Sequence, residues 1–86
     1  MQIDLKMLSA FNKQGSPIGV TSVCSAHPIV LRAALRFGRQ HESTILIEAT
    51  CNQVNHLGGY TGMRPGDFAA LVRSIAAEEG SAFFLF

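Results

Sequence analysis

Charged side chains are scarce in this sequence, and neither sign is in clear excess. Lys and Arg number 7 and Asp and Glu number 6, which together make 15% of the chain and leave a net charge of +1. A chain without a basic excess cannot neutralise a run of phosphates, so nucleic-acid binding is disfavoured. Low charge beside 48% hydrophobic residues is the opposite of a disordered composition, so we expect a packed core.

Long hydrophobic runs are also missing. No apolar stretch approaches the roughly 18–20 residues that span a bilayer, and the N-terminus has neither a basic cluster nor an apolar signal core. We therefore expect a cytoplasmic protein with no membrane contact. The two cysteines, Cys24 and Cys51, are too few for the disulfide framework of a small secreted domain, and we expect both to be buried, reduced thiols.

What the sequence does contain is an alternation of helical and strand-like patterns. Apolar spacing and turn residues predict helices over residues 3–14, 28–40 and 65–79 and strands over residues 18–24, 44–49 and 82–86. This order predicts an α/β fold in which helices cover a parallel sheet. We expect residues 1–86 to form one partial domain, because so apolar a composition in so short a chain resembles a piece of a larger core.

The helix predicted at residues 28–40 has two kinds of face. Apolar residues at helical spacing predict its buried face: Val30, Ala33, Ala34 and Phe37. Three arginines predict a solvated face: Arg32, Arg36 and Arg39. The strand at residues 44–49 contains a continuous apolar run, which predicts burial on both faces of the sheet.

Polar residues follow the first two predicted strands, at the ends where ligands bind in parallel α/β folds. The candidates are Ser25, His27, Glu48, Asn52 and Gln53. His27 is either an acid, base or metal ligand or the cap of the following helix, with equal support for each. Glu48 is favoured to line a site, because an unpaired buried carboxylate is costly. Asn52 and Gln53 either bind sugar hydroxyls or tie down a loop.

A glycine-rich stretch precedes the third predicted helix and contains Gly58, Gly59, Tyr60 and Gly62. Such a stretch can cradle a phosphate group. The spacing and the lysine of a P-loop are missing, so an ordinary turn is the favoured interpretation. Neither a zinc-ligand spacing nor a Ser-His-Asp constellation can be identified, so we expect no metal site and no catalytic triad in this chain.

Five strings, taken together and in order, resemble the GatZ/KbaZ family of class II tagatose-1,6-bisphosphate aldolase subunits. They are Val23–Pro28, Leu46–Thr50, Asn52–Val54, Gly58–Met63 and Pro65–Phe68. The resemblance runs from about Gly19 to Ile75 and so covers most of the chain. No single string is specific for the family, but their combination is.

The resemblance implies the N-terminal part of a (β/α)8 TIM barrel, about two βα units and a truncated third strand. It also implies an accessory subunit that supports the activity and stability of a separate catalytic tagatose-bisphosphate aldolase subunit in galactitol or N-acetylgalactosamine catabolism. Zinc would be held by that partner, and this chain would hold no cofactor. The residues expected at the barrel rim are Ser25, His27, Glu48, Asn52, Gln53 and Tyr60, with a candidate phosphate turn at Gly58, Gly59 and Gly62.

The sequence departs from the family pattern in three ways. Cys51 stands where Ser is usual, Arg64 replaces a Thr that would cap the next helix, and the segment expected after the third strand is missing. We therefore expect an N-terminal fragment whose open strand edges lead to aggregation, self-association or a molten state. Two alternatives stay open: a catalytic class II aldolase-like sugar-bisphosphate lyase that uses His27 and Glu48, and a small phosphate-binding α/β module.

Overall fold

The computed structural model of the protein describes residues 5–16 and 18–85. Six elements alternate in the predicted order: α1 (Leu5–Lys13), β1 (Ser22–Cys24), α2 (Pro28–Gln40), β2 (Ile45–Glu48), α3 (Pro65–Glu79) and β3 (Phe83–Leu85). The limits of α2 and α3 agree with the prediction, whereas all three strands are shorter than predicted. Residues 3–4 of the first predicted helix and residue 86 of the last predicted strand lie outside the described residues.

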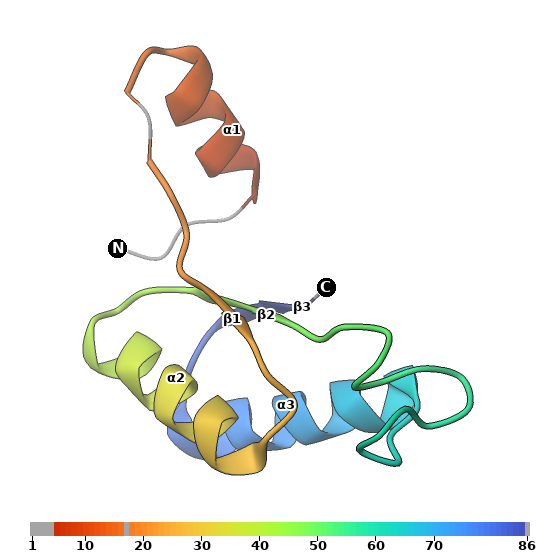
Figure 1. The fold of residues 1–86 in the computed structure, drawn as a ribbon. Helices are drawn as coiled ribbons and strands as arrows, with labels where there is room; N and C mark the ends of the chain where they lie inside the picture. The colour runs from red at the N-terminus through yellow and green to blue at the C-terminus, as the bar shows by residue number, and fades with distance from the viewer. Residues whose placement is uncertain (1–4, 17, 86) are drawn as a thin grey trace.

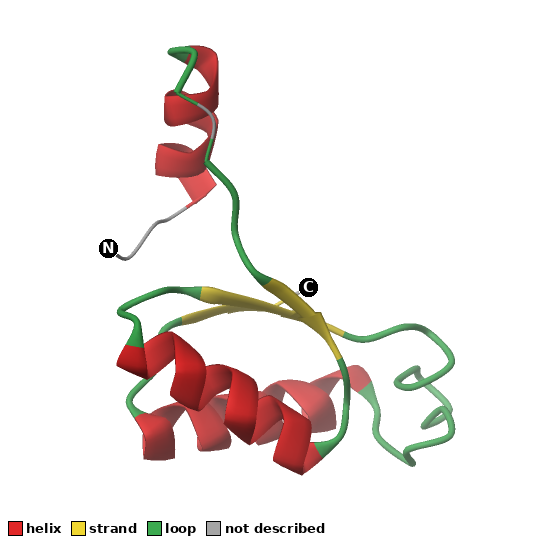
Figure 2. Ribbon diagram, turned by 60° about the vertical axis from the view of Figure 1, so that its left-hand side comes forward, coloured by secondary structure: helices red, strands yellow, loops and turns green. Residues whose placement is uncertain are grey.

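The three strands form one parallel sheet in the order β1-β2-β3, which confirms the predicted α/β class. Cys24 pairs with Glu48, and Ile47 pairs with Leu85, so the carboxyl ends of the strands lie along one edge. Both α2 and α3 lie on the same face of this sheet (Figure 1 and Figure 2). That arrangement is expected when right-handed crossovers join strands that neighbour one another in chain order.

The core lies between the sheet and these two helices. Its fully buried large side chains are Leu31, Leu35, Ile45, Ile47 and Val72. Leu46 and Glu48 alternate with the buried isoleucines of β2 and are only half-buried, because they lie on the other face of the sheet. The prediction that β2 is buried on both faces is therefore wrong: among the described residues, no helix packs across the second face.

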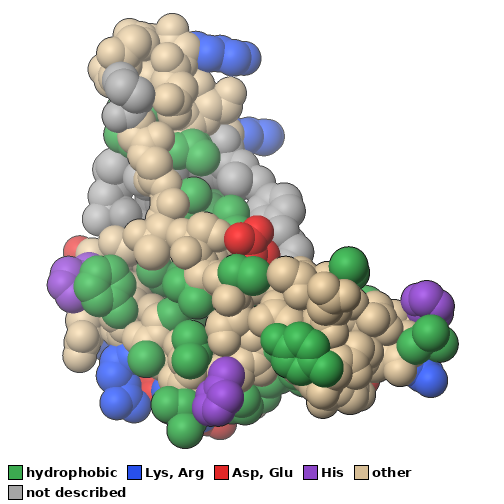
Figure 3. Space-filling view, viewed as in Figure 1, with side chains coloured by type: hydrophobic (Ala, Val, Ile, Leu, Met, Phe, Trp, Pro, Cys, Tyr) green, Lys and Arg blue, Asp and Glu red, His purple; other side chains and the backbone are tan. Residues whose placement is uncertain are grey.

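The buried face of α2 is not the one that the apolar spacing predicted. Val30 is 44% exposed and Phe37 is 47% exposed, and hydrophobic side chains are visible on the outward surface over α2 (Figure 3). The residues that α2 buries are Leu31, Leu35 and Gly38. A Cβ atom at Gly38 would lie 2.7 Å from Cγ1 of Ile45, so glycine at this position allows the end of α2 to approach β2 closely.

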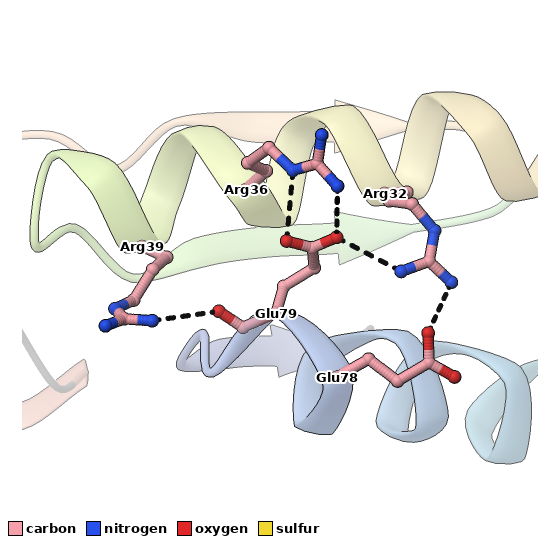
Figure 4. A network of polar contacts seen from close by, with 5 residues as sticks. All are labelled: Arg32, Arg36, Arg39, Glu78 and Glu79. Atoms are coloured by element: carbon pink, nitrogen blue, oxygen red, sulfur yellow. Dashed lines mark hydrogen bonds and ion pairs between the residues drawn. The ribbon is translucent and has the colours of Figure 1, made fainter.

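The arginines of α2 reach the end of α3 and also stay solvated, as predicted: Arg36 and Arg39 are exposed and Arg32 is half-buried. Arg32 Nη2 lies 2.6 Å from Glu78 Oε2, and Arg36 Nη2 lies 2.8 Å from Glu79 Oε1. Arg39 Nη1 donates to the backbone carbonyl of Glu79 at 3.4 Å. Figure 4 shows that all three arginines reach the end of α3. These ion pairs join the two helices that cover the sheet.

The ends of α3 are set by specific residues. Asp67 Oδ2 accepts a hydrogen bond from the backbone N–H of Arg64 at 2.9 Å, so an acidic residue in the first turn compensates for the cap that threonine would supply. Gly80 ends the helix in the left-handed conformation, with a φ of 67°.

α1 stands apart from the sheet and its two helices at the end of an extended segment (Figure 1). Its 9 residues make it the shortest of the described helices, and α3, with 15, is the longest. None of the helices in the described ranges is long and apolar enough to cross a membrane.

Candidate functional site

The two polar clusters predicted after β1 and β2 lie at the same edge of the sheet. The backbone N–H of Ser25, just beyond β1, donates to the carbonyl of Glu48 at the end of β2 at 3.2 Å. This hydrogen bond continues the parallel ladder of Cys24 and Glu48 by one step. The prediction that both strand ends share one edge is confirmed, and the loops that follow them are consequently neighbours.

A pocket of about 500 Å³ opens between these two loops and α3. Four of the six residues predicted at the rim line it: Ser25, His27, Gln53 and Tyr60. The remaining lining residues are Ala26, Pro28, Thr61, Met63 and Leu71. The pocket is therefore a largely apolar hollow with a few polar groups, which is the usual composition of a small-molecule site.

His27 both caps α2 and lines this pocket, so the two alternatives for this residue do not exclude one another. Its Nδ1 accepts a hydrogen bond from the backbone N–H of Ile29 at 3.1 Å. Because Nδ1 of His27 accepts this hydrogen bond, the hydrogen of its ring N–H lies on Nε2. Ser25 Oγ in turn accepts from the backbone N–H of His27 at 3.1 Å, which fixes the turn between β1 and α2.

Gln53 ties down the loop after β2 and also faces the pocket. Its side-chain Oε1 accepts from the backbone N–H of Thr50 at 2.8 Å, and its own N–H donates to the Thr50 carbonyl at 3.0 Å. Cys24 Sγ lies 3.9 Å from the same Oε1. Within residues 5–16 and 18–85 the side-chain NH₂ group of Gln53 has no hydrogen-bond partner, so both of its donors are available to a ligand.

Glu48 and Asn52 do not line the pocket, although both are at the same edge. The Glu48 carboxylate accepts a hydrogen bond from Ser22 Oγ at 3.2 Å on the sheet face that the helices leave uncovered. Asn52 is exposed, and its backbone carbonyl accepts from Tyr60 N–H at 2.9 Å. The roles of Glu48 and Asn52 at a barrel rim therefore stay predictions.

The glycine-rich stretch is held by hydrogen bonds within its own loop. Asn55 Oδ1 accepts from the N–H of Gly59 at 3.1 Å, and the Asn55 carbonyl accepts from the N–H of Gly58 at 2.8 Å. The N–H of Gly62 donates to the carbonyl of Gly59 at 3.3 Å. Since all three glycine N–H groups donate inside the loop, the geometry favours a turn over a phosphate cradle.

Sequence reasoning missed five residues of the pocket: Ala26, Pro28, Thr61, Met63 and Leu71. Thr61 Oγ1 donates to the carbonyl of Gln53 at 2.6 Å and accepts from the N–H of Met63 at 3.1 Å. A parallel bridge between Val54 and Met63 closes the same loop. Thr61 and Met63 lie within one of the strings that carry the family resemblance, but spacing alone could not distinguish them from other loop residues.

The remaining candidates for metal and thiol chemistry do not line this pocket. In the described part of the chain, no group of three or more His, Cys, Asp or Glu residues could hold a metal ion. Cys24 and Cys51 are both free thiols, and both are exposed, which corrects the prediction that they are buried. Cys24 is exposed because it lies on the uncovered face of the sheet, next to Glu48.

Comparison with known proteins identifies the family to which this α/β unit belongs. Residues 5–83 match the family model described as D-tagatose-1,6-bisphosphate aldolase subunit GatZ/KbaZ-like, and the chain belongs to this family. The resemblance stated from the sequence strings is thereby confirmed.

Two curated relatives and one solved structure illustrate the family's range. A D-tagatose 6-phosphate 4-epimerase of Agrobacterium fabrum is 66% identical over 76 residues, which are 88% of this chain and 18% of the relative. The D-tagatose-1,6-bisphosphate aldolase subunit GatZ of Escherichia coli is 55% identical over 78 residues, 91% of this chain and 19% of the relative. A crystal structure of a probable tagatose 6 phosphate kinase from Sinorhizobium meliloti superimposes with a TM-score of 0.72 and 46% identity, covering 79% of this chain and 18% of that one. The chain therefore spans about a fifth of the length of these proteins.

Proposed function

We propose that residues 5–85 form the first units of a (β/α)8 barrel. The strands follow one another in chain order, and both α2 and α3 lie on one face of the sheet, as in a barrel whose helices form the outer ring. The second face would then become the barrel interior. Relatives about five times as long have ample residues for the rest of a barrel, which needs about 250.

We further propose that the chain works as part of a tagatose-bisphosphate aldolase subunit of the accessory type. The observation that carries this proposal is the family match over residues 5–83, which includes every residue of the pocket at the sheet edge. A separate catalytic subunit would be its partner and would hold the zinc. The expected cytoplasmic location and self-association through the uncovered sheet belong to the same proposal.

A second candidate function is epimerisation of a phosphorylated ketohexose. The Agrobacterium fabrum relative named as an epimerase is more similar to this chain than is the Escherichia coli subunit, at 66% against 55% identity. The names of both relatives concern phosphorylated tagatose. The two candidates therefore share a substrate class and differ in whether the assembled protein itself performs chemistry.

A pair of chimeras separates these candidates. In one, this chain replaces the matching 78 residues of the Escherichia coli GatZ subunit, and in the other it replaces the matching 76 residues of the Agrobacterium fabrum epimerase. The first chimera is tested for protecting the catalytic aldolase subunit against thermal inactivation. The second is tested for epimerase turnover. Each unmodified parent protein is the control.

The accessory function predicts that the GatZ chimera protects the catalytic subunit as well as its parent does, while the epimerase chimera loses turnover. The reverse pattern would assign the chain to an epimerase. Loss of function in both chimeras, with both chimeras folded by circular dichroism, would contradict the proposal that this chain serves in either protein.

A further inference from the structure

The polar side chains of the pocket show one common pattern of hydrogen bonding. Each side-chain acceptor already receives a backbone N–H of the chain, at 2.8–3.1 Å: Ser25 Oγ, His27 Nδ1, Gln53 Oε1 and Thr61 Oγ1. Several donors of these pocket residues have no hydrogen-bond partner among residues 5–16 and 18–85. They are the hydroxyl hydrogens of Ser25 and Tyr60, the Nε2–H of His27 and the NH₂ group of Gln53.

The pocket therefore offers more unused hydrogen-bond donors than unused acceptors. His27 Nδ1 and Gln53 Oε1 are already occupied, and only the hydroxyl oxygens of the pocket keep a free lone pair. No carboxylate lines it, since the Glu48 side chain is held by Ser22 on the uncovered face of the sheet. Ala26, Pro28 and Leu71 supply apolar walls. A phosphate oxygen uses this excess of donors better than a sugar hydroxyl does, because the hydroxyl must also donate its own hydrogen.

We propose that this pocket binds an oxyanion, namely a phosphate group, through Ser25, His27 and Gln53, with Tyr60 at the mouth. Hydrogen bonds to an ionised acceptor are about twice as strong as neutral ones, and a phosphate oxygen accepts without needing to donate. The identification of the phosphate as part of a phosphorylated sugar rests on the proposed function. The preference for an anion rests on the hydrogen-bond pattern alone.

The test is an NMR titration of the 15N-labelled 86-residue chain at constant pH and ionic strength. Three probes are added separately: inorganic phosphate, a ketohexose 6-phosphate and the same ketohexose without phosphate. We expect saturable shifts at the pocket residues with the phosphorylated sugar or inorganic phosphate, and none with the free sugar. A larger affinity for the ester identifies a sugar phosphate as the ligand, and a larger affinity for inorganic phosphate identifies the free ion.

Gln53→Glu is the decisive variant. A glutamate keeps the acceptor for the Thr50 N–H and replaces the NH₂ donors by a negative oxygen, so we expect affinity for phosphate to fall by about tenfold or more. Gln40→Glu makes the same chemical change at an exposed position at the opposite end of α2, and we expect less than a twofold change. Tyr60→Phe removes one donor alone and serves as a second variant if Gln53→Glu unfolds.

Three results would overturn the proposal: saturable binding of the unphosphorylated sugar at the pocket, no saturable binding of either phosphate probe, or equal loss of affinity in Gln53→Glu and Gln40→Glu. Equal losses would mean that overall charge, rather than the pocket, governs binding. These measurements need no catalytic activity. Phosphate binding beside failure of both chimeras would leave the anion site standing and reject the proposed function, and the opposite combination would do the reverse.

Discussion

Arg36 on α2 donates two hydrogen bonds to the carboxylate of Glu79 at the end of α3, from Nε to Oε2 at 3.1 Å and from Nη2 to Oε1 at 2.8 Å. Arg32 donates to Oε1 of the same carboxylate at 3.1 Å. Together, with the Arg36 hydrogen bonds as the larger cause, they lower the pKa of Glu79 from 4.5 to about 2. One carboxylate thus joins the two helices that cover the sheet.

This pairing predicts a loss of stability in acid. A carboxyl whose pKa is lower in the folded state stabilises that state above its unfolded pKa of 4.5, and the contribution disappears as the pH falls through about 2. We expect the urea midpoint to decrease over this interval, and Glu79→Gln to make the decrease smaller. Glu78→Gln is the control, because Glu78 contacts Arg32 alone. An identical acid profile for Glu79→Gln and the unchanged chain would contradict the prediction.

The two faces of α2 should differ sharply in their tolerance of substitution. Leu35 is fully buried, so Leu35→Ala is expected to lower the free energy of unfolding by about 2–5 kcal/mol. Phe37 is 47% exposed and stacks on the ring of His41 at 4.0 Å, so Phe37→Ala should cost less than about 1 kcal/mol. Urea denaturation measures both values. A Phe37→Ala cost as large as that of Leu35→Ala would mean that this face is buried.

Two glycines of the loop provide a matched pair for close packing. Gly59 and Gly62 have φ of 59° and 79°, so alanine at either position is strained by about 1–2 kcal/mol. A Cβ at Gly59 would also lie 2.5 Å from the carbonyl oxygen of Gln53, whereas nothing lies within 4 Å of a Cβ at Gly62. We expect Gly59→Ala to lower the melting temperature clearly more than Gly62→Ala. Equal decreases in melting temperature would show that the Gln53 carbonyl moves away from the new Cβ atom without destabilising the fold.

Both cysteines should react with a thiol reagent in the native chain. Cys24 and Cys51 are exposed and free of disulfides, and an exposed thiol titrates without unfolding. We expect two equivalents to react before denaturant is added. Variants Cys24→Ser and Cys51→Ser assign each equivalent to its residue, and a thiol that reacts only in denaturant would contradict its exposure.

Element order and helix limits could be predicted because strong local signals mark them. Pro28 and Pro65 begin α2 and α3, and Gly80 ends α3, as expected for residues that favour those positions. The buried face of α2 could not be predicted, because Leu31 and Leu35 are one helical turn apart, as Val30 and Ala34 are, so both faces show a helical repeat. A helix that is apolar on two faces gives no indication of which face meets the sheet.

The sequence predicted which residues lie near the candidate site, but not how their side chains are oriented. Strand ends at one edge follow from parallel topology, so Ser25, His27 and Gln53 could be placed near one another from the sequence. The direction of the Glu48 side chain depends on the register of β2, and a shift of one residue would turn it to the other face. The contact of Thr61 with Gln53 depends on the closed path of the loop, which no short-range pattern encodes.

The close approach of α2 to β2 at Gly38 affects the pocket from a distance. α2 is about 20 Å long and turns as a unit, with Gly38 near one end and the cap His27 at the other. A side chain at position 38 would push the C-terminal end of α2 away from β2. The helix would then tilt, and its N-terminal end, which carries His27, would shift relative to the pocket. The dimensions of the anion site would then be determined by a residue that no ligand could touch, so a survey confined to the pocket lining would overlook a determinant of its selectivity.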